Sequence, residues 1–179
     1  GGRQNAMSGV VLVNLLRFGV LILFQVLVVN YADFSFYLNP YIYIMAIMLL
    51  PISMPHWLLM LIALLAGFTV DVFSNSLGMH AGAAVFMAFL QPYVTTILTP
   101  KSGYEADDKP TISSMGLTWF LAYSGILTLL YHLSYFLLEV FSFTMLHLTV
   151  LRTLVSGTAA WLLIVMFTLL VSGRATRRR

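Results

Sequence analysis

The sequence predicts an all-α membrane protein, a compact bundle of about six transmembrane helices. Of the 179 residues, 60% are hydrophobic and only 8% are charged. Soluble domains are about one quarter charged, so this chain lacks the polar side chains that a water-facing surface needs. The apolar residues are also gathered into long segments, close to the ~20 residues with which a helix crosses a bilayer. No polar stretch is long enough to fold as a separate soluble domain.

Six segments are candidate spans. They cover residues 9–30, 40–54, 56–74, 78–99, 114–138 and 149–173. The polar residues 100–113 form a loop, and residues 139–148 are too short to span and are expected at the membrane interface. We predict three parts of the chain: residues 1–6, an artificial remnant of expression; 7–173, a single six-span domain; and 174–179, a basic cytoplasmic tail.

The first span carries a polar stripe formed by Asn14, Arg17 and Gln25. Arg17 either extends to the lipid headgroups or belongs to a face that docks on another helix. A substrate path along the stripe is a third interpretation.

The second span is short because Asn39-Pro40 opens it and Pro51 and Pro55 bound it. Its apolar residues cover only about 16–22 Å as a helix, less than the ~30 Å hydrocarbon core. We expect a short helix, buried or in a locally thinned membrane. The alternative is a re-entrant hairpin with the third span.

The third and fourth spans meet at a tight turn that is rich in small residues. Ala63, Gly67 and Asp71 share one helix face, on which small residues let another helix approach closely. Gly78 and Gly82 repeat the pattern at the start of the fourth span.

Asp71 has a functional and a structural interpretation. As a charge at membrane depth it would serve as a proton relay, an ion ligand or a catalytic carboxylate. Structurally, it would cap the turn and pair with Arg152 or His80. One acid alone carries little chemistry, so we predict the structural role. The polar side chains available to cap this turn are Asp71, Ser74, Asn75 and Ser76.

The fifth and sixth spans carry the remaining ionisable residues near the outer end. His132 and Glu139 share a helix face, and together with Asp71 and His80 they would formally supply a metal site. No His-Glu-x-x-His pair accompanies them, so no metal or other cofactor is predicted. Glu139 is expected to pair with Arg152.

Basic residues near the span ends set the orientation. The Arg174–Arg179 cluster, together with Lys101 and Lys109, predicts that both termini are cytoplasmic. The terminal cluster would attract anionic lipid; no aromatic-interleaved basic patch indicates nucleic acid. Aromatic residues near the span ends are typical of interfacial belts: Tyr37, Tyr41, Trp57, Tyr93 and Trp119.

Several enzyme classes lack their motifs in this sequence. There is no cysteine, so thiolate metal sites and cysteine nucleophiles are excluded. A Gly-x-Ser-x-Gly elbow and a phosphate-binding glycine loop are also absent. We therefore predict that the protein is not an enzyme.

Around Asp71 the chain resembles the MreD family, small bacterial membrane proteins of the rod-shape (cell elongation) system. The matching run is Gly67…Asp71-Val-Phe-Ser74…Leu77-Gly78-Met-His80-Ala81, followed by an alanine-rich fourth span. The proline-bounded second span, the arginine-tipped end, the length and the six-span layout also fit. Many members have one more residue between the Asp and the Leu-Gly pair, so the geometry of the cap stays open.

The resemblance implies a non-enzymatic scaffold of the bacterial inner membrane. It would bind MreC and help couple the MreB cytoskeleton to peptidoglycan synthesis and cell shape. RodA and a class B penicillin-binding protein would belong to the wider complex. The family is similar in fold to the substrate-binding subunits of energy-coupling-factor transporters. An alternative is therefore a vitamin-like ligand-binding subunit with an outward cavity. An intramembrane hydrolase that uses Asp71 and His80 is a third hypothesis.

Overall fold

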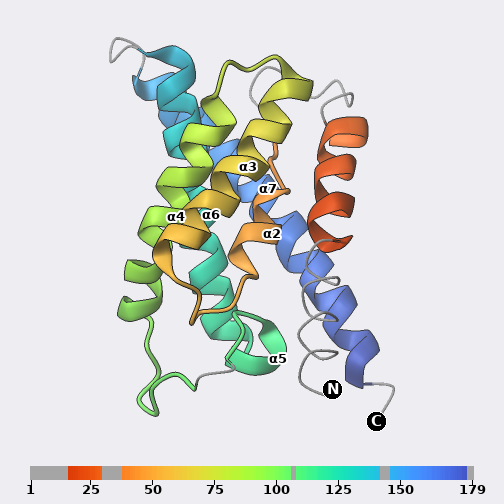
Figure 1. Cartoon of the computed structure of the whole chain (residues 1–179), viewed down its shortest axis with the longest axis vertical. Coiled ribbons are helices and arrows are strands. Elements are labelled where there is room, and N and C mark those ends of the chain that lie inside the picture. Colours follow the sequence, from red (N-terminus) through yellow and green to blue (C-terminus); the bar gives the residue numbers. More distant parts are fainter. Residues whose placement is uncertain (1–15, 30–37, 106–107, 142–145, 177–179) are drawn as a thin grey trace.

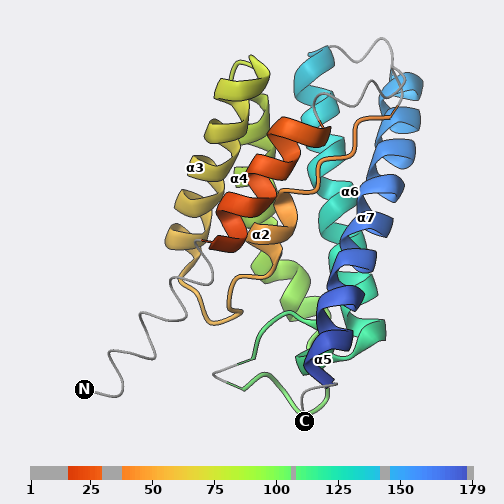
Figure 2. The same cartoon turned by 90° about the vertical axis from the view of Figure 1, so that its right-hand side faces the viewer.

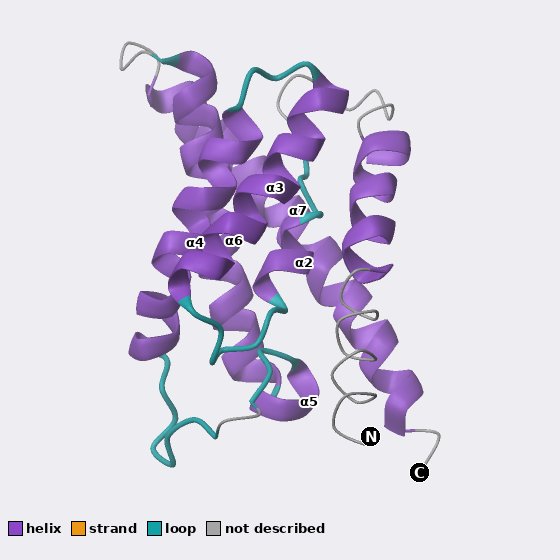
Figure 3. Ribbon diagram, in the orientation of Figure 1, coloured by secondary structure: helices purple, strands orange, loops and turns teal. Residues whose placement is uncertain are grey.

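The computed structural model describes residues 16–29, 38–105, 108–141 and 146–176. These residues form helices and no strand (Figure 3). Residues 16–24 are helical and continue into a π-helical turn, η1 (Gln25–Val29). The α-helices that follow are α2 (Ile44–Met48), α3 (His56–Ser74), α4 (Met79–Ile97), α5 (Ile112–Met115), α6 (Leu117–Val140) and α7 (Leu146–Thr176).

The long helices pack as neighbours in a bundle. α3 packs on α4, α4 on α6, and α6 on α7, while the helix of residues 16–29 contacts α3 through η1. α2 contacts α3, α4 and α6, and it lies at the centre of the bundle (Figures 1 and 2). The turn between α3 and α4 lies at one end of the bundle. The loop that follows α4 and the described end of α7 lie at the other (Figure 1).

Within the described part of the chain, three helices are long and apolar enough to cross a membrane: α3, α6 and residues Leu146–Ser172 of α7. α4 matches α3 in length, with 19 residues each, but it is less apolar because it includes His80, Gln91 and Pro92. The outer faces of α3 and α7 carry large apolar side chains that are 43–65% exposed, such as Leu65, Phe68 and Leu170. Such faces suit a hydrocarbon environment.

Helices occupy the positions of the predicted third to sixth spans, and residues 16–29 of the predicted first span are also helical. The third span ends where α3 ends, and the fourth corresponds to α4. α6 extends two residues beyond the predicted fifth span, and α7 begins three residues before the predicted sixth. The segment expected at the interface therefore belongs partly to these two helices. Residues 1–6, 9–15 and 142–145 lie outside the described residues.

The second span is not a continuous helix. Only Ile44–Met48 are helical, and the preceding residues of the segment run through the bundle as irregular backbone (Figure 2). Residues 41–50 are nevertheless all buried. The residue before a proline disfavours the α conformation, so Pro51 limits the helix at its C-terminal end. The expectation of a buried element is correct, and the expected helix length is wrong.

Candidate functional site

The Asp71 carboxylate caps the first turn of α4. Its Oδ1 accepts hydrogen bonds from the Ser76 hydroxyl and from the His80 amide at 3.0 Å, and its Oδ2 accepts from the Ala81 amide at 2.8 Å. Helix N-termini leave such amides without a partner inside the helix. Gly78, at the cap position, has no side chain to supply one, so the preceding helix supplies the acceptor.

The backbone reverses between α3 and α4 through three residues with positive φ. These are Asn75 (52°), Leu77 (51°) and Gly78 (87°). Asn tolerates this left-handed region and Gly adopts it without steric cost. A Cβ at Gly78 would meet no atom within 4 Å. The role of Gly78 is therefore conformational, and the close approach expected there from the sequence is wrong.

Gly67 is the residue that permits close packing between α3 and α4. A Cβ at this position would lie 2.6 Å from the Ala81 Cα and from the His80 carbonyl oxygen. Ala63, one turn earlier, is fully buried. Gly82 differs, because its Cβ would meet only the Leu138 side chain, at 3.1 Å. The face predicted from Ala63, Gly67 and Asp71 is thus the contact face of the α3–α4 pair.

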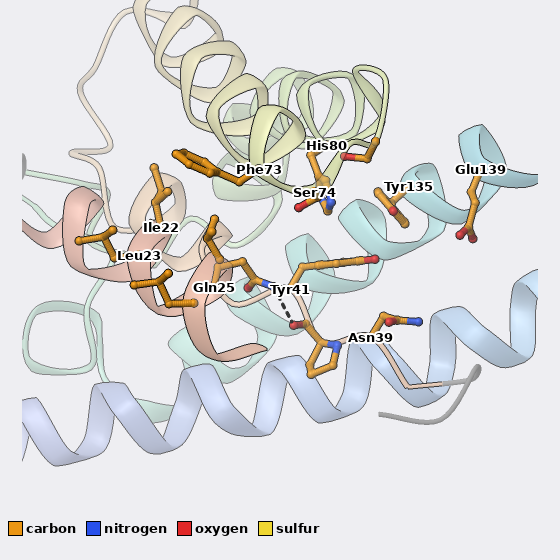
Figure 4. Close-up of a pocket in the computed structure, with 14 residues that line it drawn as sticks. Ile22, Leu23, Gln25, Asn39, Tyr41, Phe73, Ser74, His80, Tyr135 and Glu139 are labelled. Carbon is orange, nitrogen blue, oxygen red and sulfur yellow. Dashed lines mark hydrogen bonds between the residues drawn. The ribbon is translucent and has the colours of Figure 1, made fainter. Parts of the chain in front are cut away.

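Side chains from three helices satisfy the irregular backbone before α2. The Asn39 amide donates to the Ser156 hydroxyl of α7 at 2.9 Å, and the Tyr41 amide donates to His132 Nε2 of α6 at 3.3 Å. The Ile42 amide donates to Gln25 Oε1 at 2.8 Å, while Gln25 Nε2 donates to the Pro40 carbonyl at 3.4 Å (Figure 4). Buried backbone groups need partners, and non-helical backbone at membrane depth occurs only inside protein.

His132 therefore has a structural position. Besides its bond to the Tyr41 amide, its Nδ1 is 2.8 Å from the Thr128 carbonyl oxygen. Both ring nitrogens are occupied, so His132 cannot join the metal set that the sequence formally allowed. In the described part of the chain, no group of three or more His, Cys, Asp or Glu residues is arranged to hold a metal ion.

A buried aromatic cluster lies beside this segment. The Tyr43 and Tyr131 hydroxyls are 2.9 Å apart, and the Tyr131 hydroxyl is 2.6 Å from His80 Nδ1. The Tyr43 hydroxyl also donates to the His80 carbonyl at 3.4 Å. The Tyr41 ring lies with its centroid 4.6 Å from those of His80 and Tyr135. The expectation that Tyr41 belongs to an interfacial belt is wrong, since Tyr41 is only 8% exposed.

A cavity of about 530 Å³ opens next to this cluster. Ser74, His80 and Tyr41 point into the same space (Figure 4). Its volume lies within the range of small-molecule sites. The other lining residues are Ile22, Leu23, Gln25, Val26, Leu27, Asn39, Pro40, Phe73, Ser76, Tyr135 and Glu139.

Arg152 pairs with Glu139 and not with Asp71. Its two terminal nitrogens donate to the two Glu139 oxygens, and its guanidinium carbon lies 4.4 Å from the centroid of the Phe136 ring. The Arg152 side chain is 8% exposed and that of Glu139 is 33% exposed. A buried charge needs such a partner, which explains how Arg152 is tolerated near the start of α7.

The structure brings together most of the residues singled out from the sequence. Gly67, Asp71, Gly78 and His80 lie in or beside the turn. Arg17 is half-buried on the first described helix and does not line the cavity.

Sequence reasoning missed several residues of the site. Tyr43, Tyr131, Tyr135 and Ser156 were not singled out. The spacing of Tyr131 and Tyr135, four residues apart on one helix face, was the available signal.

Comparisons with protein-family models, with curated proteins and with solved structures give no match.

Proposed function

We propose that this chain is a non-enzymatic membrane scaffold of the bacterial cell-elongation system, similar to MreD. The supporting observation is the internal use of the polar groups in the segment that carries the resemblance. Among the described residues, three groups donate hydrogen bonds to the Asp71 carboxylate, and they belong to the α3–α4 turn and to the first turn of α4. His80 meets Asp71 through its backbone amide and not through its ring. This arrangement suits a packing element better than an acid–base pair.

The proposed partners are membrane proteins. MreC is the first of them, with MreB, RodA and a class B penicillin-binding protein in the wider complex. The scaffold would couple the MreB cytoskeleton to peptidoglycan synthesis and thereby to cell shape. A partner helix would find exposed apolar faces on α3 and α7, since packing contacts drive helix association in lipid.

In this proposal the chain crosses the inner membrane six times, with both termini in the cytoplasm. The support is that α3, α4, α6 and α7 run along the bundle, while residues 16–29 and the segment around α2 lie against them (Figures 1 and 2). Irregular backbone in the second crossing would be tolerated because it is buried inside protein. The basic residues Lys101 and Lys109 belong to the loop at the end where α7 terminates, as the positive-inside rule requires.

Co-purification from native bacterial membranes tests the scaffold. We expect the tagged chain to retain a bitopic partner with a large periplasmic domain. An Asp71→Leu variant, which lacks the cap, should lose this partner. A Gly19→Ala variant, in which the added Cβ meets nothing within 4 Å, should keep it and serves as the control. Retention of ATPase subunits in place of the bitopic partner would contradict the proposal.

The cavity favours a second candidate, a small-molecule-binding subunit of a transporter. It combines aromatic and polar side chains with a volume suited to a vitamin-sized ligand. Tight, saturable binding of a water-soluble, vitamin-sized ligand to the purified chain would support this candidate over the scaffold.

A further inference from the structure

We propose that the cavity binds an amphiphile that carries a primary ammonium group. This inference does not rest on the proposed partners. The lining has two chemically different sides: Ile22, Leu23 and Phe73 lie on one, and Tyr135 and Glu139 lie on the other (Figure 4). Such a division matches a molecule with an apolar tail and a polar head.

The apolar side of the cavity reaches the outer surface of the bundle. Leu23, Leu27 and Phe73 line the cavity, yet they are 57%, 62% and 65% exposed. These side chains therefore border both the cavity and the surface that would face lipid. A hydrocarbon chain can lie against them while its head group occupies the interior.

The hydrogen bonds of the aromatic cluster are compatible with a His80 tautomer that offers an acceptor to the cavity. In that arrangement the Tyr43 hydroxyl donates to the His80 carbonyl and accepts the proton of the Tyr131 hydroxyl. The Tyr131 oxygen then accepts from His80 Nδ1. A neutral imidazole protonated at Nδ1 has a lone pair at Nε2. His80 thus presents a hydrogen-bond acceptor to the cavity that it lines.

Ser76 and Glu139 offer further acceptors to the cavity. Ser76 donates its hydroxyl proton to Asp71, which leaves its oxygen lone pairs for a ligand. Glu139 pairs with Arg152, but a carboxylate has about four acceptor sites. None of the described residues that line the cavity is Lys or Arg.

A primary ammonium group fits this environment because it carries a positive charge and three N–H donors. Glu139 supplies carboxylate oxygens that it shares with Arg152, and the Tyr41 and Tyr135 rings line the cavity and can attract a cation. Two sources share this chemistry: the ethanolamine head group of a phospholipid and a free long-chain amine.

Lipid competition with the purified full-length chain tests the proposal. The chain in detergent is mixed with equal amounts of phosphatidylethanolamine, phosphatidylcholine and phosphatidylglycerol that carry identical acyl chains. Native mass spectrometry then measures which lipid is retained. We expect roughly tenfold preference for phosphatidylethanolamine, because phosphatidylcholine lacks the N–H donors and phosphatidylglycerol lacks the cation.

A second arm identifies the source of the ammonium group. Dodecylammonium is compared with dodecyltrimethylammonium by the shift that each causes in the thermal unfolding temperature. Preference for dodecylammonium without retention of phosphatidylethanolamine would support a free amine, and retention of the phospholipid would support the lipid source. Equal behaviour of the three lipids and of the two amphiphiles would overturn the proposal.

Two variants locate the binding site. Leu23→Trp fills the apolar side and should abolish the preference, while Leu65→Trp, at 58% exposure on α3 and outside the cavity, should preserve it. Glu139→Gln keeps the shape of the side chain and should reduce the preference roughly tenfold. A preference that survives Leu23→Trp would place the ligand elsewhere and reject the site. Failure of lipid binding would leave the co-purification result for the scaffold unaffected.

Discussion

Asp71 is a buried acid whose oxygens accept hydrogen bonds from the α3–α4 turn and from the first turn of α4. Oδ1 takes two of its three bonds and Oδ2 takes one. An asparagine can keep the acceptor at the Oδ1 position, but its amide nitrogen would face the Ala81 N–H. The two substitutions Asp71→Asn and Asp71→Leu therefore remove different numbers of hydrogen bonds, and they separate the cap from any role of the charge.

We predict that Asp71→Leu lowers the free energy of unfolding by about 1–3 kcal/mol for each amide left without an acceptor. Asp71→Asn should lose less, and it should still bind partners and support cell elongation. Thermal unfolding in detergent and the shape of complemented cells measure the two effects. Normal folding and partner binding of Asp71→Asn together with failed elongation would show that the charge itself is needed.

Gly67 gives a second test at the scale of one residue. We predict that Gly67→Ala destabilises the fold by roughly 1–3 kcal/mol, because its Cβ would press on the backbone of α4. The control is Gly19→Ala, also in a helix, where the added Cβ meets nothing within 4 Å and helix propensity rises. Chemical or thermal unfolding of both variants measures the difference. Equal stability of the two would mean that α3 and α4 are not in close contact.

At the scale of the element, the segment before α2 depends on partners in other helices. Its irregular backbone is satisfied by Gln25, His132 and Ser156, which come from three different helices. Each interaction also fixes the position of a helix relative to the segment. Polar side chains on these apolar helices thus hold the helices against the segment before α2. Helix docking was one of the interpretations of the polar stripe that contains Gln25.

We predict that Gln25→Leu destabilises the fold more than Gln91→Leu. The first substitution leaves the Ile42 amide and the Pro40 carbonyl without this partner, at a cost of about 1–3 kcal/mol for each. Gln91 is a matched control because it is also buried, at 4% exposure, and its Oε1 has no partner among the described residues. Unfolding in detergent compares the two variants. A larger loss from Gln91→Leu would contradict the docking role of Gln25.

At the scale of the whole molecule, the proposed six crossings place the two ends of the bundle on opposite sides of the membrane. The chain has no cysteine, so single-cysteine variants need no background substitutions. We predict that His147→Cys, at the exposed start of α7, reacts with an impermeant maleimide added to spheroplasts. Ser102→Cys and Thr176→Cys should react only after the membrane is opened. Reaction of Thr176→Cys from outside would overturn the predicted orientation.

Sequence patterns were sufficient to predict the helical class, the positions of α3, α4, α6 and α7, and the residues of the α3–α4 turn. These features are local: apolar length predicts a helix, and prolines, glycines and capping side chains mark where helices begin and end. The Arg152–Glu139 pair was also predictable, because a buried charge restricts the choice of partner.

The course of the segment around α2 and the existence of the cavity depend on packing between helices that are distant in the sequence. The partners of residues 39, 41 and 42 lie 117, 91 and 17 positions away in the sequence, and no local pattern encodes which donor meets which acceptor. Tyr41 shows the same limit. A tyrosine near the end of an apolar segment suits a membrane interface and a polar core equally well, and only the packing of α4 and α6 around it selected the core.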